Sequence, residues 1–183
     1  FVVHDKTGNV ALGHNGIGIA DRNTVAGVVR AHVALRDAVA AAGAPIDFKL
    51  IVGTRLVFTD ETPDIIAYPT DRRAWGRLCR LLTIGNLRAK KGACELRFDD
   101  LLEWGEGMVF IILPQRLSAP PREPIPIYAE ARRGGEGAVV SLGRRFPSCV
   151  WIGATMHRAG RDKRRLAMLK ALSARTGVPL IAL

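Results

Sequence analysis

Residues 16–35 read GIGIADRNTVAGVVRAHVAL and pass directly from a strand pattern to a helix pattern. The short apolar run at its start ends at Asp21, which indicates a buried strand. Asn23 and Thr24 are good helix-capping residues, and the apolar residues after them recur at the three- and four-residue spacing of a helix. Pro45 stands beyond that helix as a stop signal. A strand followed at once by a helix predicts an α/β fold.

The rest of the chain continues this alternation of apolar runs and amphipathic segments. Apolar, β-rich runs predict strands at 50–58, 64–68, 108–113, 150–152 and 178–183. Amphipathic spacing predicts helices that begin at Asp71 and at Asp99, and further helices over 127–146 and 162–175. The sequence therefore favours a single domain over 1–183, with a largely parallel sheet surrounded by helices.

The composition limits the class of protein. Of the 183 residues, 48% are hydrophobic and 24% are charged, which is enough to bury a core and argues against intrinsic disorder. No apolar run approaches the roughly 20 residues of a membrane helix, and the first residues lack the pattern of a signal peptide. The cysteines, Cys79, Cys94 and Cys149, show neither a disulfide framework nor zinc-ligand spacing. We expect a cytoplasmic protein without a membrane partner.

Positive charge is concentrated near the end of the chain. The net charge is +10, and residues 141–183 carry nine basic side chains with Asp162 as their only acid. The basic residues of one predicted helix alternate with leucines, so that the cations can face outward. These candidates for nucleic-acid binding are Arg161, Lys163, Arg164, Arg165 and Arg175. We expect weak, sequence-independent DNA binding there, and the alternative is that this basic face docks on other protein domains.

The sequence contains little self-contained chemistry. There is no P-loop and no G-x-S-x-G motif, and the four histidines are scattered without metal-ligand spacing. Asp21 is the carboxylate that we single out, because the ends of buried strands carry acids and metal ligands in β/α enzymes. The alternative for Asp21 is a structural role at the start of the following helix. No catalytic residue is predicted.

Several segments together resemble a known family. Residues 11–32, ALGHNGIGIADRNTVAGVVRAH, are similar to the second motif region of the polymerase and histidinol phosphatase (PHP) domain. The runs LIVGTRLVF at 50–58, PDIIAYPTDR at 63–72 and WGRLCRLLT at 75–83 continue the resemblance in the same order. It covers residues 11–183 and points to the PHP domain of error-prone bacterial DNA polymerase III α-type subunits.

The resemblance implies a distorted or incomplete β/α barrel, which in intact family members holds divalent metal ions (Zn, Mn or Mg). This sequence departs from the family at the ligand positions. Arg22 follows Asp21 where active members have histidine, and Arg55 stands where they have glutamate. The H-x-H motif is missing upstream, and arginines repel the cations that such ligands hold. We therefore expect no cofactor in this fragment, with Asp21 as the one candidate ligand of a degenerate metal site.

The resemblance also implies a function. We expect a fragment, truncated at both ends relative to the family, of a polymerase that synthesises DNA across damage and serves DNA repair. The nucleotidyltransferase active site of such a polymerase would lie outside this chain. The fragment itself would be a non-catalytic scaffold that contacts DNA or the remaining polymerase domains. One alternative is a stand-alone metal-dependent phosphoesterase of the PHP family. Another is a basic α/β nucleic-acid-binding module unrelated to polymerases.

Overall fold

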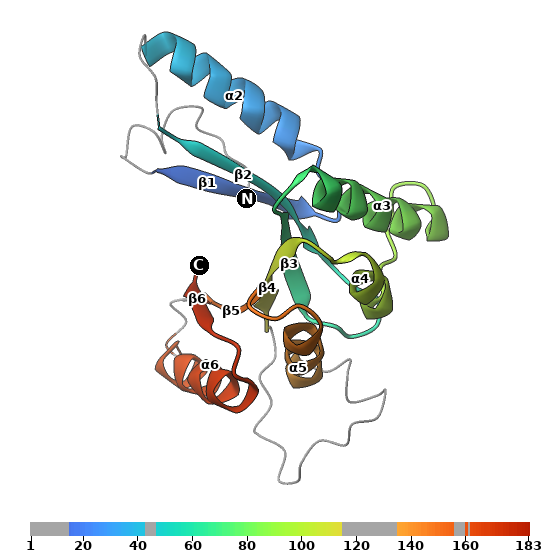
Figure 1. Cartoon of the computed structure of the whole chain (residues 1–183), viewed down its shortest axis with the longest axis vertical. Coiled ribbons are helices and arrows are strands. Elements are labelled where there is room, and N and C mark those ends of the chain that lie inside the picture. The colour runs from blue at the N-terminus through green and yellow to red at the C-terminus, as the bar shows by residue number, and fades with distance from the viewer. Residues whose placement is uncertain (1–14, 43–46, 115–134, 156–159, 161) are drawn as a thin grey trace. The chain divides into compact units, whose positions relative to one another are not determined.

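The computed structural model describes residues 15–42, 47–114, 135–155, 160 and 162–183 (Figure 1). The chain divides into two compact units, residues 1–55 and residues 56–183, which are described separately below. None of the helices in the described ranges has the length and hydropathy that a membrane-spanning helix requires.

The first unit contains a strand–helix–strand arrangement. Strand β1 (Gly16–Arg22) is followed by helix α2 (Gly27–Ala42) and strand β2 (Lys49–Leu56). The two strands pair in parallel, with Ile19 opposite Val52. A parallel pair requires a crossover connection, which α2 provides here. The strand and helix predicted from residues 16–35 are thereby confirmed.

The second unit is built on strands β3 (Asp64–Pro69), β4 (Met108–Leu113), β5 (Val150–Ala154) and β6 (Leu180–Ala182). Strands β3 and β4 pair antiparallel, whereas β4 with β5 and β5 with β6 pair in parallel. Its helices are α3 (Arg72–Arg88), α4 (Phe98–Trp104), α5 (Gly135–Arg145) and α6 (Asp162–Thr176). The prediction of an α/β fold with largely parallel strand pairing is therefore confirmed.

The core of the second unit is apolar and well packed. Phe98, Phe110 and Ile152 are almost completely buried, and the ring centroids of Phe110 and Phe146 lie 5.2 Å apart. Burial of such large side chains contributes about 1.5–3 kcal/mol each, which makes this core the main source of stability. Along α3 the spacing of the apolar residues matches the buried side of the helix, whereas β4 is apolar along its whole length.

Helix boundaries follow local capping chemistry. The helix predicted to begin at Asp71 is α3, which Asp71 caps: its Oδ1 accepts a hydrogen bond of 2.7 Å from the backbone N of Ala74. Helix α4 begins at Phe98, one residue before the predicted start at Asp99. Of the helix predicted over 127–146, residues 127–134 lie outside the described residues, and α5 occupies the rest of that range up to Arg145.

Candidate functional site

The carboxyl ends of β1 and β2 hold the residues that the sequence singled out for metal binding. Asp21 lies opposite Thr54, and Arg22 lies opposite Arg55. Oδ2 of Asp21 accepts a hydrogen bond of 2.8 Å from the backbone N of Gly27, the first residue of α2. The hydroxyl of Thr54 donates to the Asp21 carbonyl at 2.8 Å. The Asp21 carboxylate is thus oriented toward the start of a helix, where a negative charge is favourable.

These residues do not fit a divalent metal centre. In the described part of the chain, no three His, Cys, Asp or Glu side chains lie together in an arrangement that could hold a metal ion. The arginines at positions 22 and 55 occupy neighbouring strands in register, and their charges oppose cation binding. His32 lies on the exposed side of α2, and the other three histidines, His4, His14 and His157, lie outside the described residues.

The basic residues of the C-terminal region do not share one environment. Lys163 and Arg164 are exposed on α6, whereas Arg165 is partly buried and its Nη2 donates to the carbonyl of Pro114 at 2.8 Å. The Nε of Arg165 is buried, and no other residue in the described part of the chain forms a hydrogen bond with it. Arg161 lies outside the described residues.

Arg175 is engaged within the unit. Its Nε and Nη2 each lie 3.0 Å from a carboxylate oxygen of Glu136, which joins the end of α6 to the start of α5. This paired hydrogen bond raises the pKa of the Arg175 guanidinium. Of the described DNA-binding candidates, Lys163 and Arg164 are therefore the ones whose charges are most accessible to a partner.

A groove of about 560 Å³ lies between α5 and the connection from α6 to β6. Its lining includes Val140, Gly143, Arg144, Trp151, Arg175 and Val178. The groove lies at the amino ends of β5 and β6, because Ser148 and Pro179 also line it. Catalytic groups of α/β folds gather at the opposite, carboxyl ends of the strands. The location therefore does not favour a catalytic role for this groove.

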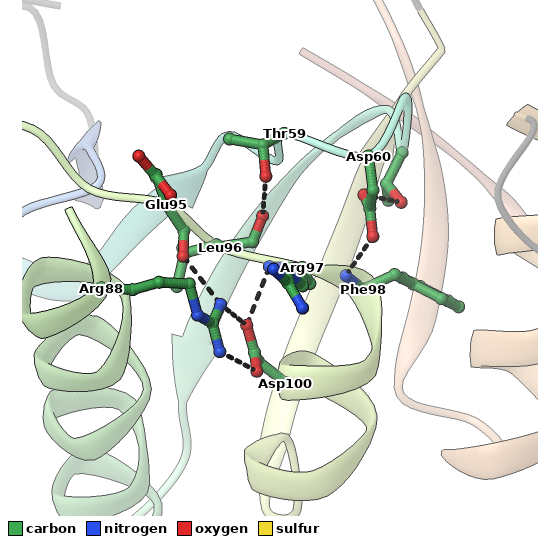
Figure 2. A network of polar contacts seen from close by, with 9 residues as sticks. Thr59, Asp60, Arg88, Glu95, Leu96, Arg97, Phe98 and Asp100 are labelled. Atoms are coloured by element: carbon green, nitrogen blue, oxygen red, sulfur yellow. Dashed lines mark hydrogen bonds and ion pairs between the residues drawn. The ribbon is translucent and has the colours of Figure 1, made fainter.

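Figure 2 shows a polar network that joins three segments of the second unit. The backbone N and the hydroxyl of Thr59 both donate to the carbonyl of Leu96, at 3.0 and 3.1 Å. Oδ2 of Asp60 accepts from the backbone N of Phe98 at 2.8 Å, at the start of α4. These bonds fix the entry into α4 against the segment that precedes β3.

The charged part of the same network links α3 to α4 (Figure 2). Nη1 and Nη2 of Arg88 donate to the Asp100 carboxylate at 2.7 and 3.0 Å, and Nη1 also donates to the Glu95 carbonyl at 2.9 Å. The hydrogen bond from Arg88 is the main cause of a lowered pKa for Asp100, and the backbone N of Arg97 adds to it. This network is structural, and the sequence predicted only that a helix begins here, at Asp99.

The sequence of this chain is similar to part of several known proteins. No protein-family model matches the chain. It is 40% identical over 167 residues to the error-prone DNA polymerase of Sinorhizobium medicae and 42% identical over 173 residues to that of Brucella abortus. These matches cover 91% and 94% of this chain but only 13% and 14% of the polymerases, so the chain spans about one seventh of their length.

A solved structure shares the fold. A protein of Bifidobacterium adolescentis, assigned as a metal-dependent phosphoesterase, superposes with a TM-score of 0.50. The sequences are 15% identical, and the match covers 96% of this chain and 78% of that one. This likeness confirms the predicted PHP-like α/β fold, and at this level of identity it concerns the fold alone.

Proposed function

We propose that this chain, which is 40% and 42% identical to part of the error-prone DNA polymerases of Sinorhizobium medicae and Brucella abortus, is the PHP-like region of such a polymerase and a non-catalytic domain of it. In this proposal it serves as a scaffold that contacts DNA or the remaining polymerase domains in the bacterial cytoplasm. DNA synthesis across damage would be the activity of the whole polymerase.

The geometry at Asp21 is the observation that carries the non-catalytic role. Phosphodiester hydrolysis by metal ions needs several ligands that converge on one point. Here the carboxylate of Asp21 accepts a hydrogen bond from the helix terminus at Gly27, and its sequence neighbour is an arginine that pairs in register with Arg55. A strand end arranged in this way stabilises the strand–helix connection and supplies one carboxylate instead of a ligand cluster.

The alternative function is a stand-alone metal-dependent phosphoesterase, the class to which the Bifidobacterium adolescentis protein with a similar fold is assigned. The donor set of the described residues counts against it. Elemental analysis of the purified chain, after incubation with Mn²⁺ or Zn²⁺, separates the two functions. We expect no stoichiometric metal and no hydrolysis of a chromogenic phosphodiester above the protein-free rate. Metal-dependent turnover that is abolished by Asp21→Ala would establish the phosphoesterase instead.

The contact with DNA is tested separately from metal chemistry. Fluorescence anisotropy with a short labelled DNA, at low and moderate salt, measures whether the whole chain binds and how steeply the affinity falls with salt. The exposed pair Lys163→Glu with Arg164→Glu reports on the C-terminal basic face without disturbing the contact of Arg165 with Pro114. Binding that this double variant weakens supports the DNA-facing role of α6, and unchanged binding assigns α6 to docking on protein.

A further inference from the structure

The outward side of α3 carries arginines that the proposed function does not use. Arg72, Arg73 and Arg80 are exposed, and Gly76 lies between them on the same side of the helix. These four residues are called the arginine face below. The opposite side of α3 is buried and comprises Ala74, Leu78, Leu81, Leu82 and Gly85. The arginine face is therefore the solvent side of a helix whose other side is fixed in the core.

Helix stability does not explain the first two arginines. Arg72 and Arg73 are the first residues of α3, and its first turn contains no acidic residue. The start of a helix carries a partial positive charge, so cations placed there lower helix stability. In the described residues neither side chain makes a hydrogen bond or an ion pair, although the charge of Arg73 helps to lower the pKa of Asp71, after the larger effect of the Ala74 N–H. An anion bound from outside would offset this local excess of positive charge.

Gly76 is an independent observation that points to the same surface. A glycine inside a helix costs about 0.5–1 kcal/mol relative to alanine. Packing gives no reason for it, since a Cβ at Gly76 would have no atom within 4 Å. Gly76 follows Arg72 and precedes Arg80 by one helical turn each. The missing side chain leaves the backbone open to close approach at the centre of the arginine face.

Arg77 and Arg80, further along α3, each contact a residue outside the helix. The guanidinium of Arg80 lies 5.8 Å from the ring centroid of Trp104. Nε of Arg77 donates to the Glu106 carbonyl at 2.6 Å. Arginines that are already positioned lose less side-chain entropy when they bind an anion. Arg72 and Arg80 are separated by about 12 Å along the helix axis, a span over which a DNA strand presents more than one phosphate.

We propose that the arginine face of α3 binds the phosphodiester backbone of DNA. Arg72, Arg73 and Arg80 contact phosphates, and Gly76 allows the strand to approach the helix closely. A polyanion fits this face better than a protein surface of mixed charge, because the face has cations at both ends and no acid between them. The inference rests on the proposed DNA-facing role of the chain and assigns that role to α3.

Fluorescence anisotropy of the whole chain with a short fluorescein-labelled duplex tests the assignment. We expect the double variant Arg72→Gln with Arg73→Gln to weaken binding about tenfold at low salt and to reduce the salt slope by nearly two units. The matched control is Arg30→Gln with Arg36→Gln on α2, which removes the same charge from two exposed positions. We expect this control to change the affinity much less than the α3 double variant does.

Gly76→Gln separates binding from folding. Glutamine is a better helix former than glycine and meets no neighbour at this position, so the melting temperature should rise. Its side chain would nevertheless obstruct the approach of DNA, so the affinity should fall without any change in charge. Opposite signs for these two measurements support the proposal, whereas a stabilised variant with unchanged affinity overturns it.

The outcomes distinguish this inference from the proposed function. If the wild-type chain binds no DNA at low salt, the DNA-facing role is wrong and the assignment to α3 is overturned with it. If the wild type binds and only the Lys163→Glu, Arg164→Glu variant loses affinity, the DNA-facing role holds and the α3 assignment alone is overturned. If the α3 variants lose affinity for polyglutamate but not for DNA, the arginine face belongs to an acidic protein partner.

Discussion

The Asp21 carboxylate and the Gly27 backbone are in direct contact: Oδ2 accepts a hydrogen bond of 2.8 Å from the Gly27 N, and a Cβ at Gly27 would clash with the same oxygen. The absence of a side chain at position 27 is what allows the carboxylate to reach the start of α2. The two residues act as one connection between β1 and α2.

We predict that Asp21→Ala lowers the free energy of unfolding by about 1 kcal/mol, because it removes this helix-terminal hydrogen bond. In a Gly27→Ala background the Cβ already displaces the carboxylate, so the same change should cost much less. Chemical denaturation of the four proteins in this double-mutant cycle measures the coupling. Additive effects would show that the connection contributes nothing to stability.

The Arg88–Asp100 pair should make stability depend on pH in the acid range. The hydrogen bond from Arg88 lowers the pKa of Asp100 below its unfolded value, which is near 3.9. The stabilisation is therefore fully present above that unfolded value and is lost as the pH falls through the folded pKa. Asp100→Asn should cost about 1–2 kcal/mol at neutral pH and flatten the acid limb of the stability curve.

Asp99→Asn is the matched control for this pH dependence, since Asp99 is exposed in the same first turn of α4. Thermal melts of both variants across the acid range make the comparison. An acid limb that Asp99→Asn flattens as much as Asp100→Asn does would assign the effect to the helix terminus and not to the pair with Arg88.

Gly105 is predicted to be intolerant of any side chain. It ends α4, and a Cβ there would lie 2.6 Å from the Leu101 carbonyl oxygen, 2.9 Å from the Phe146 ring and 3.0 Å from the Phe110 ring. Gly105→Ala should therefore destabilise the chain by about 1–3 kcal/mol through overpacking. Gly76→Ala, at a position with no neighbour, should instead be stabilising, and thermal melts compare the two.

Arg164 and Arg165 should differ although they are adjacent in sequence. Arg165→Ala removes the hydrogen bond to the Pro114 carbonyl and the packing of its partly buried stem, which should cost about 1–2 kcal/mol. Arg164→Ala, at an exposed position, should stay within about 0.5 kcal/mol of the wild type. Equal effects in urea denaturation would contradict this division of the basic residues.

Local sequence patterns predict most elements of the fold. The strand predicted over 108–113 coincides with β4, and the helix predicted over 162–175 ends one residue early relative to α6. The start of α3 at Asp71 also follows from the sequence, because an aspartate cap bonds to a backbone N–H only three residues away. These features depend on neighbouring residues, and periodicity and capping record such neighbours directly.

Long-range relationships are not visible in the same patterns. The antiparallel direction of the β3–β4 pairing is set by packing, and apolar spacing does not encode it. The partner of Arg165 is a carbonyl 51 positions earlier, and that of Arg175 is a carboxylate 39 positions earlier. The sequence left Asp21 open between a helix cap and a metal ligand, and only the folded position of Gly27 supplies its hydrogen-bond donor.

The network around Arg88 and Asp100 has a consequence for chain connectivity. Side-chain hydrogen bonds between Arg88 and Asp100 hold the end of α3 against the start of α4. The packing of these two helices therefore does not depend on the exposed loop at 90–92 that connects them. Gly92 adopts a φ of +88° there, and a Cβ at this position would meet no neighbour. A proteolytic nick or an inserted tag in this loop would leave the Arg88–Asp100 and Asp60–Phe98 bonds intact. This loop is therefore a place where we expect new chain ends or a spectroscopic label to disturb the fold little.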